Sequence, residues 1–231
     1  MEKNVLLIGG SYGIGYEIAK QLSEKHQVYV ASRTCDKLAD IGVTHIPFDV
    51  LKDDISQKNI PSEIHGFVFC PGSINLKPFK MLGVDDFKND MDINFYALVN
   101  VVKSIIDRMA KDSSMVFFST VAVGKGMPFH SSVSSAKGAI EGFARAMAAE
   151  YAPKLRINVI APSLVDTPLA ERLLDNDKKK NLMAERHPLK RVGTAKDIAN
   201  MATFLLDPDN LWITGQVIGI DGGMATLNVQ Q

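Results

Sequence analysis

Cysteine is scarce in this chain and long apolar runs are absent, and each absence excludes a class of protein. Cys35 and Cys70 are the only cysteines. They have neither the spacing of metal ligands nor the density of a disulfide-stapled domain, so we expect reduced structural thiols and no metal site. No apolar stretch approaches the roughly 20 residues that a membrane-spanning helix needs, and the N-terminal residues enter a strand without a signal-like segment. We therefore expect a cytoplasmic protein without a membrane span.

An excess of charge of one sign is also missing. Lys and Arg together number 26, as do Asp and Glu, so the formal net charge is zero. Nothing in this balance draws the surface to a nucleic acid or to an anionic membrane. The expected partner is a small-molecule substrate. The 231 residues, 46% of them hydrophobic, suffice for one large α/β domain or two small ones.

What is present is an alternation of strand-sized and helix-sized segments from end to end. Short apolar or β-branched runs occur at Asn4-Ile8, Gln27-Ala31, Thr44-Phe48, Gly66-Cys70, Met115-Ser119, Arg156-Ala161 and Gln216-Ile220. Helical spacing is clearest at Gly13-Lys25, Asp85-Met109, Ser131-Tyr151 and Thr194-Leu206, the last opened by a capping box of Thr194 and Asp197. A βαβα order predicts one α/β domain over residues 1–231, with a Rossmann-type, doubly wound parallel sheet of about seven strands covered by helices on both faces.

One segment breaks the alternation. Between Leu164 and Gly193 the periodicity weakens, and Met, Lys and Arg accumulate before His187-Pro188. An insertion after the sixth strand hangs over the edge of the sheet where ligands bind in open α/β folds. We interpret it as a lid over the substrate, with a solvated helical excursion as the alternative.

Glycines follow the first predicted strand and open a helix, in the order Gly9-Gly10-Ser11-Tyr12-Gly13-Ile14-Gly15. Glycine at such a turn lets the backbone approach a pyrophosphate and lets the helix pack closely on the strand. Free N–H groups and the positive end of the helix dipole then attract the phosphates. A strand, a glycine loop and a helix at the start of a βαβ chain predict a dinucleotide site.

The spacing of Gly9, Gly13 and Gly15 resembles that of the short-chain dehydrogenase/reductase family, and later segments match the family in order over nearly the whole chain. The resemblance implies an adenine contact for Asp49-Val50, a structural and proton-relay role for Asn94, a catalytic role for Lys137, a Pro-Gly turn at Ala161-Pro162-Ser163, a carboxamide contact for Thr167, and a C-terminal signature at residues 213–215 and 221–223. Ile8, Ser163 and the segment 69–72 depart from the family's residues without threatening the fold.

The end of the second strand bears on the choice of cofactor. An acidic residue there would hold the ribose 2′-hydroxyl of NAD and repel a 2′-phosphate, but this chain has Ser32-Arg33-Thr34. An arginine offers a charged planar fork to a phosphate, so NADP(H) is predicted in preference to NAD(H). The residues expected to contact the cofactor are Gly9, Ser11, Tyr12, Gly13, Ile14, Gly15, Ser32, Arg33, Thr34, Asp49, Val50, Pro71, Gly72, Lys137, Pro162, Val165 and Thr167.

The family's proton donor is missing. In members that reduce ketones, a tyrosine four residues before the lysine protonates the oxyanion, and here that position holds Val133. The position of the family's serine holds Thr120, which keeps a hydroxyl and has Ser119 beside it. A positioned general acid contributes about 10²–10⁴ in rate. The loss of the tyrosine therefore weakens the interpretation as an ordinary alcohol dehydrogenase.

His130 is the predicted substitute acid. It lies seven residues before Lys137, a spacing at which two residues share a helical face. This resembles the divergent enoyl-thioester reductases of the same family, whose tyrosine precedes the lysine by seven residues. An imidazole can protonate an alkoxide or an enolate near neutral pH, but a loop histidine is also commonly solvated or a helix cap. Further candidates are Ser131, Ser132, Ser134 and Ser135, of which Ser131 is equally a helix N-cap.

Two functions follow. Asn94, Thr120 and Lys137 favour an NADPH-dependent reductase of a carbonyl or an activated double bond, with a non-standard proton donor. Val133 favours a protein that binds NADP(H) without catalysis and serves as a regulator or assembly subunit. Family resemblance also implies a homotetramer or homodimer, with the helices at 85–109 and 131–151 packed against their symmetry mates. The sequence does not identify the substrate.

Overall fold

The predicted strands form one parallel sheet in the computed structural model, which describes residues 2–228. In chain order they are β1 (Asn4–Ile8), β2 (Gln27–Ser32), β3 (Thr44–Pro47), β4 (Ile64–Phe69), β5 (Met109–Phe118), β6 (Leu155–Pro162) and β9 (Val217–Ile220). Their order across the sheet is β3-β2-β1-β4-β5-β6-β9. Strands are added toward one edge of the sheet from β1 to β3 and toward the other edge from β4 onward. Such a switch point, between β1 and β4, opens a crevice at the carboxyl ends of the strands.

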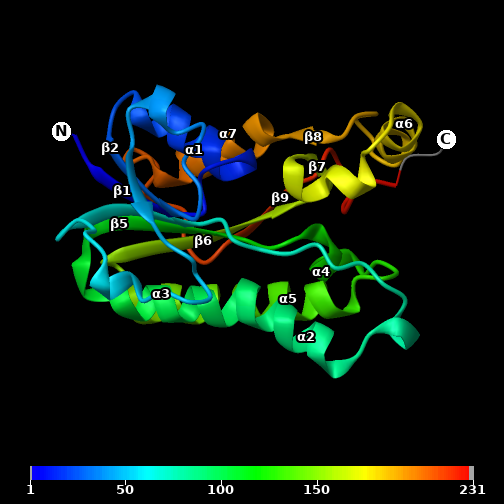
Figure 1. Cartoon of the computed structure of the whole chain (residues 1–231), viewed down its shortest axis with the longest axis horizontal. Helices are drawn as coiled ribbons and strands as arrows, with labels where there is room; N and C mark the ends of the chain where they lie inside the picture. Colours follow the sequence, from blue (N-terminus) through cyan, green and yellow to red (C-terminus); the bar gives the residue numbers. More distant parts are fainter. Residues whose placement is uncertain (1, 229–231) are drawn as a thin grey trace.

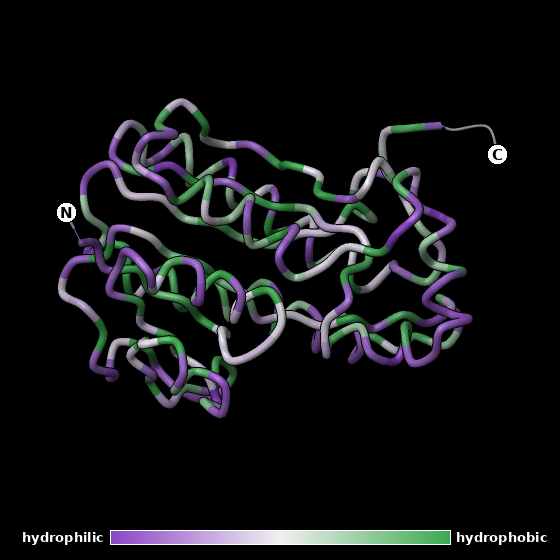
Figure 2. The backbone as a smooth tube through the Cα atoms, turned by 90° about the horizontal axis from the view of Figure 1, so that it is seen from above, coloured by the Kyte–Doolittle hydropathy of each residue, from purple (hydrophilic) through white to green (hydrophobic). Residues whose placement is uncertain are grey.

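Helices cover both faces of this sheet. α1 (Gly13–Ser23) and α7 (Ala195–Leu206) lie on one face, and α2 (Val84–Met91), α3 (Ala97–Ile105) and α5 (Ser131–Tyr151) lie on the other (Figure 1). Alternating side chains of β1 feed the two resulting cores: Leu6 and Ile8 join the cluster under α3 and α5, whereas Val5 and Leu7 join the cluster under α1 and α7. Apolar and polar stretches accordingly alternate along the chain (Figure 2). The predicted doubly wound α/β fold is confirmed.

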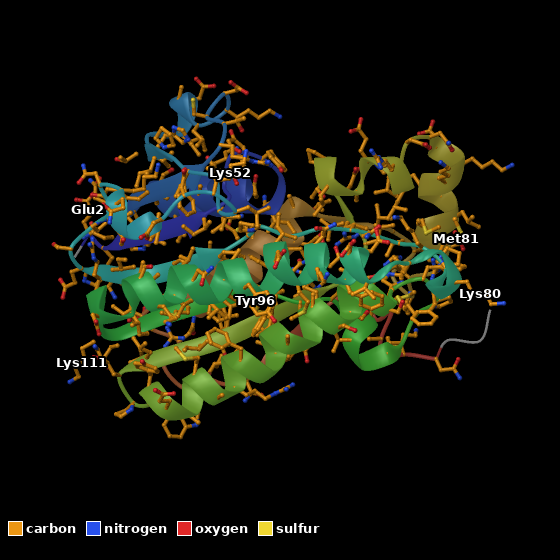
Figure 3. The ribbon with its side chains drawn as sticks, turned by 60° about the horizontal axis from the view of Figure 1, so that its bottom comes forward. Glu2, Lys52, Lys80, Met81, Tyr96 and Lys111 are labelled. Carbon is orange, nitrogen blue, oxygen red and sulfur yellow. The ribbon has the colours of Figure 1, made fainter. Side chains whose placement is uncertain are left out.

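The long helix predicted over residues 85–109 is real but interrupted. It consists of α2, a π-helical turn η4 (Asp92–Tyr96), α3 and a 3₁₀ turn η5 (Ile106–Arg108). The π turn adds a residue to the helical repeat. It leaves Asn94 fully buried and Tyr96, labelled in Figure 3, 52% exposed. Such turns are frequent at functional sites, and the hydrophobic periodicity did not reveal this one.

Only β1 has both of its predicted bounds; most other strand boundaries differ from the prediction by one or two residues, and the start of β5 differs by six. β5 begins at Met109, well before the predicted Met115, because the exposed pair Lys111 and Asp112 hides its first half from an apolar pattern. Cys70, predicted to end a strand, lies just after β4. The helix α4 (Val121–Lys125) was not predicted, whereas α5 has the predicted bounds. The capping box of Thr194 and Asp197 at α7 is also present.

The segment 164–193 contains short elements rather than one long loop. They are β7 (Val165–Asp166), the 3₁₀ helix η6 (Pro168–Leu173), α6 (Asp177–Glu185) and β8 (Gly193–Thr194), and β7 pairs with β8 in a separate ladder. These elements gather at the same end of the molecule as α4 (Figure 1). Three 3₁₀ turns complete the fold: η1 (Ala39–Ile41), η2 (Ile55–Gln57) and η3 (Phe79–Met81). Within residues 2–228, no helix has both the length and the apolar character needed to cross a bilayer.

Candidate active site

A cavity of about 950 Å³ opens at the carboxyl edge of the sheet. Every residue expected to contact the cofactor lines it, and so do Thr120, His130, Val133 and Lys137. The volume lies at the upper end of the range for ligand and cofactor sites. The fold therefore brings the predicted binding residues together in one place, although they are spread over most of the sequence.

The glycine loop forms the floor of one half of the cavity. Gly9 and Gly13 have φ angles of +73° and +61°, which favour glycine. A Cβ atom on Gly15 would lie 2.2 Å from the carbonyl oxygen of Gly9, so no other residue fits there without a shift of the backbone. Tyr12 caps α1 without a side-chain hydrogen bond. The first N–H groups of the helix therefore face an open cradle that suits a pyrophosphate.

Hydroxyl groups surround the arginine at the end of β2. Thr34 Oγ1 donates a 2.9 Å hydrogen bond to Ser11 Oγ, and Ser32 Oγ donates a 2.8 Å bond to the Thr34 carbonyl. Arg33 is exposed and forms no hydrogen bond or ion pair with another residue of the range 2–228. On the far side, the Asp49 carboxylate accepts a 3.1 Å bond from the Leu51 N–H. The guanidinium group is thus free to receive an anion.

Lys137 lies at the other half of the cavity. Its Nζ donates a 3.0 Å hydrogen bond to the carbonyl oxygen of Phe118 at the end of β5. Burial lowers the pKa of this ammonium group to about 8. A Cβ atom on Gly72 would lie 3.1 Å from Lys137 Nζ and 3.0 Å from Asn94 Oδ1, so the chain passes closely over both groups. The Lys137 ammonium has the position and the charge needed to hold ribose hydroxyls.

Asn94 lies behind the cavity wall, in a buried polar cluster that was not predicted. Its Nδ2 donates to Ser73 Oγ and to the Asp90 carbonyl, both at 2.8 Å. The Asp90 carboxylate, only 2% exposed, accepts 2.6 Å bonds from Ser73 Oγ and Ser132 Oγ. Ser132 is therefore committed to Asp90. None of the four serines proposed as candidate acids is among the residues that line the cavity.

Val133 stands at the position of the family's tyrosine. Val133 is 5% exposed and lines the cavity, and Thr120 lines it with an Oγ that accepts a 3.3 Å bond from the Ala122 N–H. Ser119 instead donates a 2.7 Å bond to Glu141. His130 occupies the N-cap position of α5, which had been considered for Ser131.

The His130 side chain has a defined tautomer in its neutral form. Its Nδ1 lies 2.7 Å from the Pro128 carbonyl oxygen. Because a carbonyl oxygen only accepts, Nδ1 carries the hydrogen. The second ring nitrogen is left for the cavity that His130 lines.

A second histidine of the cavity wall was missed by the sequence reasoning. His187 is 4% exposed, with Nδ1 2.8 Å from the Met183 carbonyl oxygen and Nε2 2.9 Å from Ser163 Oγ. Both His187 and Ser163 line the cavity. The available signal was Ser163, which stands where the family has glycine.

The charge of the described lining is one-sided. Asp49 is its only carboxylate, whereas Arg33, Lys137 and Arg186 are cationic, and two histidines accompany them. The walls contributed by segment 164–193 are mainly apolar, with Leu169, Leu173 and Met183 among them. The cavity therefore suits an anionic ligand with an apolar part.

The sheet order, the glycine cradle and the buried lysine define a Rossmann-type protein with a site shaped for a dinucleotide. A family model described as "Enoyl-(Acyl carrier protein) reductase" matches residues 9–225. The chain belongs to the short-chain dehydrogenase/reductase family. The resemblance read from the motifs is thereby confirmed.

Individual relatives match along nearly the full length. The 3-oxoacyl-[acyl-carrier-protein] reductase FabG of Chlamydia muridarum is 30% identical over 249 aligned residues, which cover 97% of this chain and 98% of the relative. The glucose 1-dehydrogenase of Gluconobacter oxydans is 27% identical, with coverage of 96% and 91%. The ligand-free aldohexose dehydrogenase of Thermoplasma acidophilum has a similar structure, with a TM-score of 0.87, 25% identity, and coverage of 100% and 98%.

Proposed function

We propose that this chain is an NADP(H)-dependent reductase that acts on a carbonyl or an activated double bond with a non-standard proton donor. The observation that carries the proposal is the buried Lys137 in one cavity with the glycine loop, Arg33 and Thr120. Burying an ammonium group costs free energy, and groups buried at such a cost are concentrated at functional sites. Holding a cofactor ribose is the task that we propose for Lys137.

The cofactor would lie along the carboxyl edge. The glycine loop and the start of α1 would hold the pyrophosphate, and Arg33 would hold the 2′-phosphate. Pro162, Val165 and Thr167 would hold the carboxamide end. When bound, a reduced nicotinamide supplies a hydride to the substrate and is itself oxidised.

The chain's own side chains would orient and protonate the substrate. The Thr120 hydroxyl would donate a hydrogen bond to its oxygen, and the Lys137 ammonium, charged below its pKa of about 8, would favour negative charge nearby. Two histidines line the described cavity, so the proposed donor is His130, as the sequence predicts, or His187.

Segment 164–193 is proposed as the lid over the substrate. It contributes Leu169, Leu173, Met183 and Arg186 to the cavity wall, and no residue of α6 is buried. A helix without a buried face gains little from packing, so it can move at low cost. The relatives named as acyl-carrier-protein reductases support a substrate with an apolar chain and a reducible carbonyl group.

We also propose a homo-oligomer in the cytoplasm. On the two helices expected to form the interface, several apolar residues belong to the core instead, among them Leu98, Val102, Ala144 and Ala148. Tyr96, Ala146 and Ala149 remain exposed on η4 and α5. These small and aromatic side chains are what the interface would use.

The alternative function is an NADP(H)-binding regulator without catalysis. Val133 favours it, because an apolar side chain occupies the donor's position in the cavity wall. Purified protein should be titrated with NADPH and then assayed for NADPH oxidation against paired ketones and enoyl thioesters. Turnover that Lys137→Ala abolishes supports the reductase. Tight binding without turnover of any substrate supports the regulator.

A further inference from the structure

Ser163 and His187 form a hydrogen-bonded couple in the cavity wall, and the Met183 carbonyl determines the direction of the hydrogen bond between them. A carbonyl oxygen only accepts hydrogen bonds, so the contact of 2.8 Å places the hydrogen on Nδ1 of His187. In the neutral ring Nε2 is then an acceptor. The Ser163 hydroxyl donates to it across 2.9 Å. When the ring is cationic, Nε2 donates to Ser163 Oγ and frees the serine proton for the cavity.

Backbone contacts fix the positions of Ser163 and His187. Ser163 follows Pro162, the last residue of β6, and its N–H donates a 3.4 Å bond to the Ile220 carbonyl of β9. His187 packs against the backbone of Gly222, where an added Cβ would lie 3.7 Å from the histidine Cβ. A hydroxyl, an imidazole and a group that orients the imidazole form a recurring proton-transfer arrangement. The serine reaches the cavity at the carboxyl edge of the sheet.

We propose that Ser163, recharged by His187, delivers the proton that the missing tyrosine delivers elsewhere in the family. This inference rests on the proposed reductase function. When the substrate carbon accepts a hydride, the electron pair of its C=O bond, or of a C=C bond conjugated to a thioester carbonyl, shifts and leaves negative charge on the carbonyl oxygen. The Ser163 hydroxyl gives its proton to that oxygen, and Ser163 Oγ takes a proton from Nε2 of cationic His187. A ketone is reduced to an alcohol and an enoyl thioester to the enol of the saturated thioester, and the neutral imidazole regains from the solvent the one proton that each reduction consumes.

The surroundings of the two histidines favour this route over one through His130. His187 is 4% exposed, and the Ser163 hydroxyl connects its Nε2 to the cavity. His130 lies in the loop 126–130 and is half-buried, so it is less enclosed than His187. A donor shielded from bulk water transfers its proton to the substrate rather than to solvent.

The test compares His187→Ala, Ser163→Ala and the double variant with the wild type, using the ketone or enoyl thioester that the wild type reduces fastest. We expect kcat to fall by about 10²-fold or more in each single variant. The double variant should be no worse than either single variant, because the two residues act as one unit. Added imidazole should restore His187→Ala and should not restore Ser163→Ala.

The matched controls lie far from the cavity: His65→Ala at β4 and Ser23→Ala at the end of α1 should keep wild-type kcat. Ser163→Gly, which installs the family's residue, keeps the test valid where His187→Ala fails to fold. In the cofactor-free protein, imidazole ¹⁵N NMR should show His187 protonated at Nδ1, with an Nε2 signal that shifts in Ser163→Ala. An unchanged Nε2 signal contradicts the couple without reference to activity.

Three other outcomes overturn the inference. Turnover within a few-fold of wild type in both single variants overturns it and leaves the reductase function intact. Imidazole rescue of His130→Ala, with none for His187→Ala, assigns the donor to the loop. A wild type that binds NADPH and turns over no substrate overturns the proposed function and this inference together.

Discussion

Lys137 Nζ donates its 3.0 Å hydrogen bond to the carbonyl oxygen of Phe118, and this contact joins α5 to the carboxyl end of β5. The carbonyl replaces only part of the water that an exposed ammonium group would bind, and burial lowers the Lys137 pKa to about 8. The charged form is therefore disfavoured in the folded, cofactor-free protein. In the proposed reductase, function and stability are therefore opposed at this residue.

Lys137→Met should stabilise the cofactor-free protein at pH 7. The folded pKa of about 8 lies below the ordinary 10.5, so the unfolded chain binds more protons between these values and the penalty is complete below pH 8. Removing the penalty and losing one hydrogen bond should raise the free energy of unfolding by roughly 2 kcal/mol. Urea melts of both proteins should show this gain at pH 7 and its disappearance as the pH rises toward 10.5. A variant that is less stable than the wild type at pH 7 would contradict the conclusion that burial of the Lys137 ammonium group destabilises the folded protein.

Arg33→Ala should separate the two cofactors. The guanidinium has no partner among residues 2–228, and Arg33 lines the cavity. Loss of a charge-assisted bond to the 2′-phosphate should raise the Kd for NADPH by about 10- to 100-fold. The Kd for NADH should change little. Fluorescence titration of both cofactors checks this, and equal losses for the two would exclude a phosphate contact.

Gly15→Ala should abolish cofactor binding or the fold itself, since its Cβ would lie 2.2 Å from the Gly9 carbonyl oxygen. Gly142→Ala is the matched control. It lies within α5, and nothing is found within 4 Å of its added Cβ. The control should keep NADPH affinity and gain up to about 1 kcal/mol of stability from helix propensity. Similar behaviour of the two variants would show that the glycine cradle is not tight.

Val133→Tyr should raise turnover of ketones. The valine lines the cavity four residues before Lys137, and a phenol there would return the family's acid to its usual place. A gain of about tenfold or more in kcat is expected if acid catalysis limits the wild type. Val133→Phe, which has similar bulk and no hydroxyl, is the control. Equal rates in the two variants would show that ring size alone has an effect.

Much of the fold was predictable from sequence, because parallel strands buried on both faces are apolar along their whole length. Helix α5 and the capping box of α7 were predicted to the residue for the same kind of local reason. The first half of β5 and the π turn at Asn94 were not. Lys111 and Asp112 interrupt the apolar run there, and a π turn leaves no regular pattern in the sequence.

The residues of the site were predictable where a sequence motif marks them. They were not predictable where only the packing of the chain brings them together. The glycine loop, Arg33 and Lys137 have fixed places in a βαβ chain and line the described cavity. His187 lies in the irregular segment 164–193, and its pairing with Ser163 depends on how that segment folds back. Asp90 lies within the helix predicted over residues 85–109 with no motif to mark it, and in the structure it is buried and accepts hydrogen bonds from two serine hydroxyls.

Hydride transfer itself tests the central claim most directly. The wild type should be incubated with NADPH deuterated at the transferable position of C4 and with the best ketone or enoyl thioester, and the product examined by mass spectrometry. A product that carries one carbon-bound deuterium for each NADPH consumed is the predicted result. A product without deuterium, or no product from a protein that binds NADPH, would contradict the assignment as a reductase.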